Sequence, residues 1–237
     1  MLAPFSIIIP CYNEERRIGQ TLRLTLDYLA ANAPESELIV VNDGSTDGTG
    51  AIARERLKSA NITARLLENF PNRGKGAAVR SGLLAAQTPI GLFSDADLST
   101  PLEEMEKLIT PIANGEVDIA FGSRALDRSL IGVHQPWRRE QAGRVFNLLV
   151  RMATGLPFWD TQCGFKAFSL EPCRPILESA QIEGFAFDVE LLYLAHQAGL
   201  RIREVPVQWN HAEGSKVSFF RDSLRMLREV ITLRAKS

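Results

Sequence analysis

The stretch IGLFSDADLSTPLEEMEKLITPI (residues 90–112) contains the pattern that decides the fold. It begins with an apolar run at residues 90–93, typical of a buried strand, and continues directly into the acidic run DAD at residues 95–97. Residues 101–112 then follow a helical pattern, with Pro101 near the first turn, where a missing N–H group is tolerated. A strand that leads through a polar turn into a helix is one unit of an α/β sheet.

The same alternation recurs on both sides of this stretch. The predicted strands lie at residues 5–10, 38–41, 62–67 and 117–121, and the predicted helices at residues 16–31, 46–59 and 75–86. Ser45 or Thr46 is the expected N-cap of the helix at residues 46–59. Repeated alternation of apolar strands with helices predicts an α/β fold with a mostly parallel central sheet flanked by helices.

The second half of the chain is less regular. Residues 125–136 have no clear period and predict a mobile loop. Further elements are expected as a helix at 137–154, loop and strand at 158–168, a helix at 187–198 closed by Gly199, and an edge strand at 202–209. No linker marks a boundary, so we expect one domain over residues 1–237. Its expected parts are a nucleotide-side half (1–124), an acceptor-side half (125–216) and a C-terminal helix (217–237).

That C-terminal segment predicts a basic amphipathic helix, because Phe219, Leu224 and Val230 alternate with arginines such as Arg221 and Arg228. A helix of this kind can lie at a membrane surface, or it can pack on its own domain. The sequence leaves both interpretations open.

Composition excludes several classes of protein. Lys and Arg total 27 against 28 Asp and Glu in 237 residues, so bulk charge does not suggest a nucleic-acid partner. Cys11, Cys163 and Cys173 form no CxxC pair, which argues against a disulfide framework or a zinc site and fits a reducing cytosol. No apolar run is long enough for a membrane span or a signal peptide. We therefore expect a cytoplasmic protein that can still lie on a membrane.

Polar residues follow four of the predicted strands. They are Tyr12, Asn13 and Glu14 after the first strand, Asn42 and Asp43 after the second, Asp95 and Asp97 after the fourth, and Ser123 and Arg124 after the fifth. Ligands of open parallel sheets bind outside the carboxyl ends of the strands. We therefore expect these groups to share one cleft.

Asp95 and Asp97 are the candidate metal ligands, because paired carboxylates suit Mg²⁺ or Mn²⁺ bound together with substrate phosphates. An isolated DxD is more often a solvated turn, and its position directly after a buried strand favours function. Asp43 and Glu14 fit either turn chemistry or hydrogen bonds to a nucleotide. The sequence RGKG precedes a helix and is not a P-loop, but Lys75 near the helix N-terminus can still meet a nucleotide.

Several cationic residues are candidate anion binders. They are Arg124, Arg138, Arg139 and Lys216. Arginine can bind a phosphate through two parallel hydrogen bonds, whereas lysine acts as a point charge. Each of these residues alone is more often a surface residue, and together around a cleft they suit a substrate with several phosphates.

Nine motifs together resemble family 2 inverting glycosyltransferases of the GT-A fold, over nearly the whole chain. In order they are IIIPCYNEE (7–15), VVNDGSTDGT (40–49), NRGKGAAVRSG (72–82), FSDADLSTP (93–101), FGSRA (121–125), RREQAGRVFN (138–147), DTQCGFKAF (160–168), FAFDVELLYLA (185–195) and EVPVQW with GSK (204–209 and 214–216). Within the family they are similar to the polyprenyl-phosphate transferases, and closer to the dolichyl-phosphate glucosyl branch than to the mannosyl branch.

The resemblance implies a role for each matched residue. The residues expected to bind the donor nucleotide are Pro10, Tyr12, Asn13, Glu14, Asp43, Lys75, Asp95, Ala96, Asp97 and Lys216. Among these, Asp97 would bind the metal, while Asp95 and Ala96 would touch ribose and diphosphate. Ser99 stands where mannosyl relatives have a further ligand, Gln. Arg124 and Arg139 match the arginines that receive the lipid phosphate, and Lys216 would close over the diphosphate.

The implied reaction is transfer of a hexose, with inversion, from a nucleoside diphosphate sugar such as UDP-glucose to a polyprenyl or dolichyl phosphate. An acceptor with a hydroxyl group would instead need a general base, for which Asp160, Asp188 and Glu190 are candidates. With a phosphate acceptor, Asp188 and Glu190 would position the acceptor half of the cleft.

Other functions also remain open. They are transfer from GDP-mannose, transfer to a sugar hydroxyl in polysaccharide synthesis, and a binding protein that has lost catalysis. Glucosyl relatives usually carry membrane anchors. Here we expect peripheral contact at the cytoplasmic face through the terminal helix and through Leu130, Ile131 and Val133. The sequence does not indicate an oligomeric state.

Overall fold

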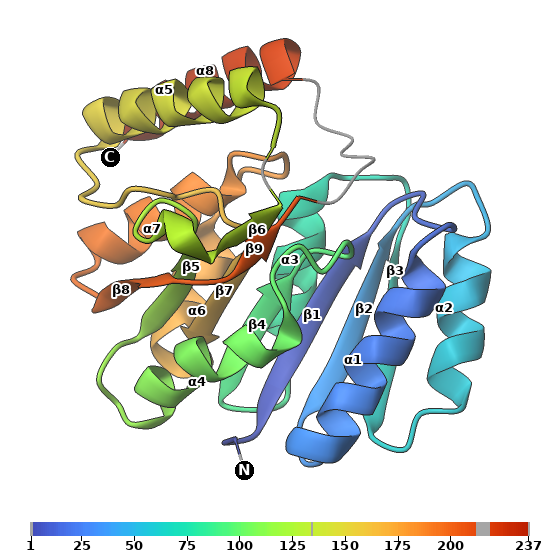
Figure 1. The fold of residues 1–237 in the computed structure, drawn as a ribbon. Coiled ribbons are helices and arrows are strands. Elements are labelled where there is room, and N and C mark those ends of the chain that lie inside the picture. The colour runs from blue at the N-terminus through green and yellow to red at the C-terminus, as the bar shows by residue number, and fades with distance from the viewer. Residues whose placement is uncertain (1, 134, 212–218, 237) are drawn as a thin grey trace.

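The computed structural model describes residues 2–133, 135–211 and 219–236 and is built on a seven-stranded sheet with the order β3-β2-β1-β4-β7-β5-β8 (Figure 1). Its strands are β1 Phe5–Cys11, β2 Glu37–Asp43, β3 Thr63–Asn69, β4 Ile90–Ser94, β5 Ile119–Ser123, β7 Phe165–Ser169 and β8 Ile202–Pro206. All neighbouring pairs are parallel except those of β7, which runs antiparallel to both β4 and β5. The predicted α/β class with a mostly parallel sheet is confirmed.

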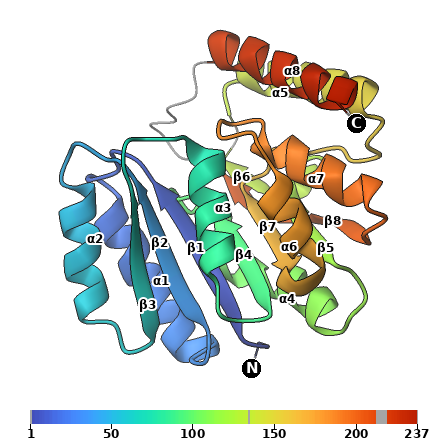
Figure 2. The same cartoon turned by 180° about the vertical axis from the view of Figure 1, so that it is seen from behind.

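Helices cover both faces of the sheet. On one face lie α1 (Ile18–Asn32), α2 (Thr49–Lys58) and α4 (Met105–Ala113), and on the other lie α3 (Lys75–Ala85), α6 (Leu170–Ser179) and α7 (Phe187–Gln197) (Figures 1 and 2). Strand alternation explains the two layers. Ile7 and Ile9 pack in the same cluster as Leu22 of α1, whereas Ile8 packs in the opposite cluster with Leu83 of α3.

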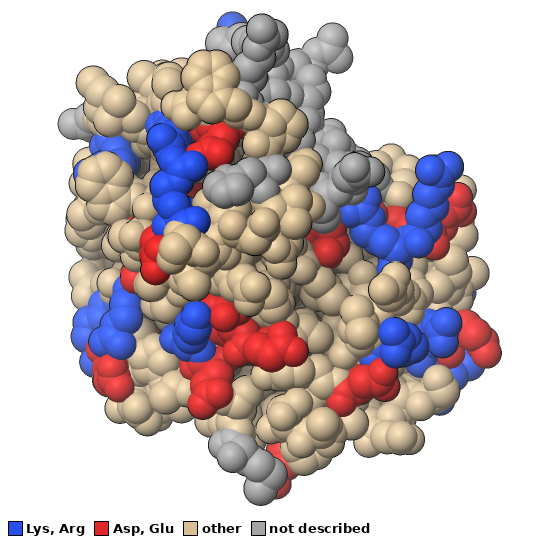
Figure 3. All heavy atoms as spheres, in the orientation of Figure 1, with Lys and Arg blue, Asp and Glu red and all other residues tan. Residues whose placement is uncertain are grey.

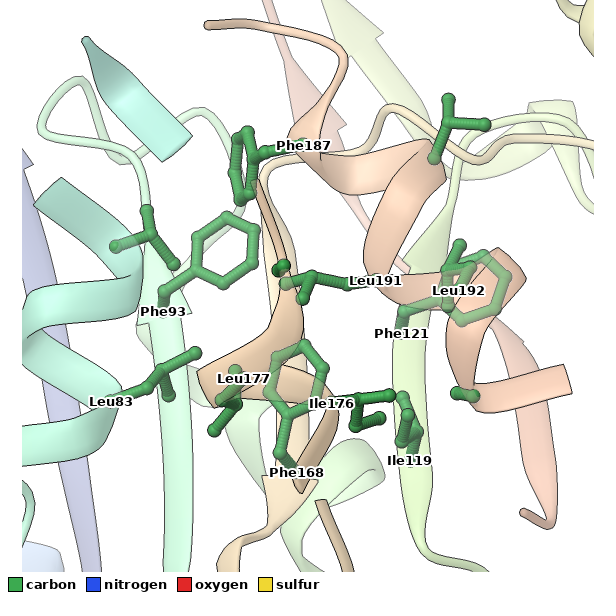
Figure 4. Close-up of a cluster of buried hydrophobic side chains, with 14 of the residues drawn as sticks. Leu83, Phe93, Ile119, Phe121, Phe168, Ile176, Leu177, Phe187, Leu191 and Leu192 are labelled. Carbon is green, nitrogen blue, oxygen red and sulfur yellow. The ribbon is translucent and has the colours of Figure 1, made fainter. Parts of the chain in front are cut away.

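Aromatic side chains fill the second layer under the middle of the sheet (Figure 4). Phe93 of β4 lies 6.5 Å from Phe168 of β7 and 5.5 Å from Phe187 of α7, measured between ring centroids. Phe121 of β5 meets Phe158 edge to face at 5.1 Å. Phe93 is the last residue but one of β4 and Phe121 lies at the centre of β5, so this cluster packs beneath the carboxyl halves of both strands.

Two long helices form a separate layer. α5 (Trp137–Thr154) and α8 (Phe219–Lys236) lie side by side beyond the carboxyl ends of the parallel strands (Figures 1 and 2). Met226 and Val230 of α8 are buried in the same cluster as α7. The predicted C-terminal helix is confirmed over the described residues, and these contacts bear out the interpretation that it packs on the domain.

Three local predictions were wrong. Neither Ser45 nor Thr46 caps α2, whose N-cap is Gly48, because the Ser45 hydroxyl and the Thr46 N–H are bonded to Asn13 instead. The segment predicted as a mobile loop contains a 3₁₀ turn at Arg128–Leu130 and the strand β6 (Ile131–Val133). The segment 202–209, predicted as one strand, forms β8 and then the separate strand β9 (Trp209–Asn210), which pairs with β6.

The helix α6 was not among the predicted elements, and its sequence LEPCRPILES contains two prolines. Pro172 lies in the first turn, where its missing N–H has no intrahelical partner to lose, and Pro175 is tolerated one turn later. Gly199, by contrast, has the left-handed φ of 72° expected of the residue that ends a helix.

Within the described ranges, no helix is both long enough and apolar enough to cross a membrane.

Glu37 fixes the opposite, amino end of the sheet. Its carboxylate is buried and accepts hydrogen bonds from the Ser6 hydroxyl (2.5 Å), the Gln87 N–H (2.6 Å) and the Arg65 guanidinium (2.8 Å). Burial opposes the charged form, but these three donors outweigh it and lower the pKa of Glu37 below its usual value.

Glu37→Gln should therefore reduce the free energy of unfolding at pH 7 by about 1–3 kcal/mol. Because the folded pKa is lowered, the contribution of Glu37 is present above its unfolded pKa of about 4.3 and is lost as pH falls through the folded pKa. Urea titrations from pH 7 to pH 3 should show the two proteins converging in stability. A difference that stays constant down to pH 3 would contradict this assignment.

Candidate active site

A cavity of about 650 Å³ opens where β4 and β5 end. Its volume is in the range of pockets that bind small molecules. The predicted residues that line it are Lys75, Asp95, Asp97, Ser99, Arg124, Asp160 and Asp188. The structure thus brings together carboxylates and cations from α3, α7 and the ends of β4 and β5. The prediction that polar groups after four strands share one cleft holds for the groups after β4 and β5, whereas those after β1 and β2 do not line this cavity.

The loops after β1 and β2 are joined beside this cavity. Asn13 has a left-handed φ of 53°, donates its N–H to the Ser45 hydroxyl (2.9 Å), and accepts from the Thr46 N–H (2.8 Å). The Glu14 N–H donates to the Thr49 hydroxyl at 2.7 Å. The predicted nucleotide-binding residues outside the cavity lining are Pro10, Tyr12, Asn13, Glu14, Asp43 and Ala96. They lie on or beside the neighbouring strand ends, and their contacts with a nucleotide stay a prediction.

Asp43 organises the loop that leads into α3. Its buried carboxylate accepts hydrogen bonds from the side chains of Asn69 (3.0 Å) and Asn72 (2.8 Å) and from the N–H groups of Arg73 (3.2 Å) and Gly74 (2.7 Å). This carboxylate therefore fixes the residues immediately before Lys75.

Lys75 and Asp95 form an ion pair of 2.6 Å inside the cavity. Burial works against the charge of Lys75, but the carboxylates of Asp95 and Asp188 outweigh it and raise the pKa of the amine. Lys75 therefore stays an ammonium group at neutral pH. It joins the beginning of α3 to the end of β4.

Gly164 is a site residue that sequence reasoning missed. Its carbonyl accepts the Asp95 N–H at 3.2 Å, and a Cβ atom at this position would overlap the Asp95 carboxylate. The signal was available, since Gly164 lies in the motif DTQCGFKAF beside Asp160.

Asp97 follows Asp95 on the same turn. Its Oδ1 accepts the Ser99 N–H at 3.0 Å, and Leu98 between them has φ 47°, which is uncommon for a non-glycine residue. In the described parts of the chain, no three His, Cys, Asp or Glu residues cluster closely enough to hold a metal ion. A metal held here would combine protein carboxylates with ligands from a substrate or from water.

Arg124 is fixed by Asp160. The guanidinium donates through Nε and Nη2 to the two Asp160 oxygens, each at 2.7 Å, and the Arg124 N–H adds a third bond at 2.9 Å. Burial alone would raise the pKa of Asp160, but the charge of Arg124 outweighs it and lowers that pKa. Glu204 in turn accepts the N–H groups of Trp159 and Asp160.

One face of α5 contributes four polar residues to the cavity that were not predicted. Glu140, Arg144, Asn147 and Arg151 line it at helical spacing. Glu140 pairs with Arg144 (3.1 Å) and also with Arg128, while the Arg151 guanidinium lies 3.8 Å from the centre of the Trp159 ring. The spacing of these residues could have found them, because residues 137–154 were predicted to be one helix.

Four further predicted residues differ in their contacts or lie outside the cavity lining or the described atoms. Asp188 pairs with the buried Lys166 at 2.6 Å. Glu190 does not line the cavity, and its oxygens accept the N–H groups of residues 181 and 182. Arg139 lies in α5 with a side chain outside the described atoms, and Lys216 lies outside the described residues.

Comparison with known proteins identifies the family. The sequence profile of Glycosyl transferase family 2 matches residues 6–176. The chain belongs to this family. A dolichyl-phosphate beta-glucosyltransferase from Drosophila melanogaster is 38% identical over 240 residues, which cover 96% of this chain and 73% of that protein. A dolichyl-phosphate beta-glucosyltransferase from Homo sapiens is 34% identical over 244 residues, which cover 98% of this chain and 75% of that protein.

Solved structures agree on the fold of this family 2 glycosyltransferase. Glucosyl-3-phosphoglycerate synthase from Mycobacterium tuberculosis, in complex with Mn²⁺, UDP-glucose and phosphoglyceric acid, has a TM-score of 0.70 at 24% identity. The match covers 99% of this chain and 79% of that chain. The expected GT-A fold is therefore confirmed.

The contact between Gly164 and Asp95 makes a sharp prediction for the transferase. Gly164→Ala should reduce kcat/KM for sugar transfer by about 100-fold, because the added methyl group displaces a carboxylate inside the site. Gly184→Ala is the matched control, since its added Cβ would meet no atom closer than 3.8 Å. Circular dichroism should show that both variants fold. Equal kcat/KM for the two variants would contradict the placement of Asp95.

Proposed function

We propose that this chain transfers glucose, with inversion, from UDP-glucose to a polyprenyl phosphate of the dolichyl type. One observation carries the proposal: a single cavity combines paired carboxylates at the end of β4 with arginines on α5, and an exposed apolar stripe borders those arginines. The names of the relatives support this acceptor, and the UDP-glucose bound by glucosyl-3-phosphoglycerate synthase supports this donor.

The acceptor side suits a phosphate attached to a long apolar chain. Arg124, Arg144 and Arg151 offer guanidinium groups that can bind phosphate oxygens in pairs. Next to them, exposed apolar side chains follow helical spacing at Val145, Leu148, Leu149 and Met152. Exposed apolar area of this kind marks contact with another apolar surface. A soluble sugar acceptor would have no use for it.

The general-base candidates support a phosphate acceptor over a hydroxyl acceptor. Asp160 is held by Arg124, Asp188 by Lys166, and Glu190 by backbone N–H groups. The charge of Arg124 lowers the pKa of Asp160, which makes this carboxylate a weak base. Burial raises the pKa of Asp188, but its Oδ1 already accepts a hydrogen bond from Lys166. A phosphate acceptor needs no general base, because its oxygen is already ionised at neutral pH.

In the proposed step, an acceptor phosphate oxygen attacks the anomeric carbon of glucose. The bond from that carbon to the donor diphosphate breaks, and its electron pair leaves with UDP. Arginines such as Arg124 would orient the acceptor anion, and Lys75 would place a positive charge beside the donor. Positioning and charge stabilisation then account for most of the rate enhancement.

The residues present fit a divalent cation. Asp95 and Asp97 supply hard oxygen ligands in the cavity, and Mg²⁺ usually binds through one or two carboxylates together with substrate phosphates. Asp97 is the preferred protein ligand, because Asp95 is already paired with Lys75. A bound Mg²⁺ or Mn²⁺ would neutralise charge on the departing diphosphate.

We further propose peripheral contact with a membrane through α5, at the cytoplasmic face. The upper part of the molecule, where α5 lies, shows mostly uncharged surface with both basic and acidic groups beside it (Figure 3). Of the three loop residues expected to reach a membrane, Val133 is exposed, whereas Leu130 and Ile131 are half-buried. The α5 stripe is therefore the better candidate surface. Free, buried cysteines are compatible with the cytoplasm.

Purified protein incubated with UDP-glucose, Mn²⁺ and a polyprenyl phosphate should form glucosyl lipid, and GDP-mannose should be a poor donor. Arg124→Lys should reduce the rate by about 10- to 100-fold, since lysine cannot reproduce paired bonds to a phosphate. Thin-layer chromatography of radiolabelled lipid measures the product. Transfer to a sugar hydroxyl, with none to lipid from any donor, would overturn the proposal.

The membrane surface can be tested separately. Val145→Glu combined with Met152→Glu should lower binding to anionic phospholipid vesicles by about tenfold or more, because charge replaces apolar area. Neither residue lines the cavity, so transfer to a short-chain, water-soluble polyprenyl phosphate should be retained. Leu24→Glu on α1 is the control, because it also replaces an exposed apolar side chain by a charged one. Co-sedimentation that is equal for both variants would reject α5 as the contact surface.

A further inference from the structure

Lys166 is a buried lysine for which the proposed reaction has no direct role. Its side chain on β7 is fully buried and does not line the cavity. Its ammonium group lies between the rings of Phe93 (5.5 Å) and Phe121 (5.8 Å). Burying an ammonium group in apolar surroundings is strongly unfavourable unless it is paired and hydrogen-bonded. The contacts of this group therefore indicate what it does.

Lys166 makes two short polar contacts. Its Nζ donates to the Cys163 carbonyl at 2.5 Å and pairs with Asp188 Oδ1 at 2.6 Å. The first contact leads directly to Asp95, because the next residue, Gly164, accepts the Asp95 N–H and packs against the Asp95 carboxylate. Lys166 thus holds the turn on which the backbone and side chain of Asp95 rest.

The second contact, with Asp188, is connected to Asp95 by electrostatic interactions that pass through Lys75. Asp188 acts electrostatically on Lys75, and Lys75 pairs with Asp95 at 2.6 Å. The four groups therefore alternate in sign, from Lys166 through Asp188 and Lys75 to Asp95. With Lys166 in place, Asp188 has its own partner, and Lys75 can remain on Asp95.

We propose that Lys166 is a positioning residue that holds Asp95 and Lys75 in the arrangement that receives the donor diphosphate. Without Lys166, Asp188 is a buried carboxylate that lacks its partner, and the ammonium group of Lys75 is drawn away from Asp95 toward it. The turn at residues 163–164 loses its hydrogen bond at the same time. The inference rests on the proposed function only in taking the ligand to be a nucleoside diphosphate.

The test compares three variants. Lys166→Met removes the ammonium group, and Lys166→Met with Asp188→Asn removes the pair without leaving a buried charge. Arg65→Met is the matched control, because it likewise takes a cation from a buried carboxylate, Glu37, at the opposite end of the sheet. Calorimetry gives the Kd of UDP with Mn²⁺, and thermal unfolding reports stability. If UDP does not bind the unmodified protein, GDP with Mn²⁺ is the probe.

Lys166→Met should raise the nucleotide Kd, and the donor KM, by about 10- to 100-fold, with a smaller change in kcat. The double variant should recover part of the lost affinity, because Lys75 is then no longer drawn to Asp188. It should stay about threefold or more weaker than the unmodified protein, because the Cys163 carbonyl still lacks its donor. Arg65→Met should lower the unfolding temperature and leave the Kd unchanged.

Three results would overturn the proposal. They are an unchanged Kd for Lys166→Met, a folded double variant that binds no better than Lys166→Met, and an equal loss of affinity in Arg65→Met. If Lys166→Met does not fold, a folded double variant that binds the nucleotide as tightly as the unmodified protein overturns the proposal, because it too lacks the bond from Lys166 to the Cys163 carbonyl. The proposed function is tested by a different assay, lipid glucosylation. Nucleotide binding needs no acceptor, so failure of either claim can be recognised without the other.

Discussion

The ion pair between Lys75 and Asp95 is the interaction on which the rest of the site depends. Lys75 begins α3, and the Asp43 carboxylate fixes the loop before it. Asp95 follows β4 and rests on Gly164. The pair therefore sets the distance between the loop after β3 and the loop after β4. Those two loops border the same side of the cavity.

The insertion of β7 explains how the two halves of the chain form one cavity. β7 lies between β4 and β5 and runs antiparallel to both. The segment before β7 therefore passes over the carboxyl ends of its neighbours. Asp160 in this segment binds Arg124 after β5, and Gly164 binds Asp95 after β4. One short segment thus connects the proposed donor groups with the proposed acceptor groups.

The sequence was sufficient to predict the groups at the strand ends and not those that hold them. Asp95, Asp97 and Arg124 could be found because each follows an apolar run that predicts a strand. In a parallel sheet, ligands bind at the carboxyl ends of the strands. Gly164 and Lys166 depend on the order of strands in the sheet, which a local pattern does not contain. Lys166 also contradicts the expectation that lysines are exposed, and only its partners Asp188 and Cys163 explain its burial.

Pairing of opposite charges also holds two arginines that line the cavity. Arg124 is paired with Asp160, and Arg144 with Glu140, so the proposed acceptor groups are held in place before a phosphate arrives. Such preorganised charges stabilise a reacting anion without rearrangement during the reaction. The same pairing explains why Asp160 and Asp188, expected as possible bases, fit a positioning role better.

The central claim is that the donor diphosphate binds at the Asp95–Asp97 turn together with a divalent cation. Electron paramagnetic resonance of Mn²⁺ in the presence of UDP tests it most directly, in the unmodified protein and in Asp97→Asn. The account predicts protein-bound Mn²⁺ that depends on UDP, and affinity at least about tenfold weaker in Asp97→Asn. An Asp97→Asn protein that binds Mn²⁺ and UDP as tightly as the unmodified protein would contradict it.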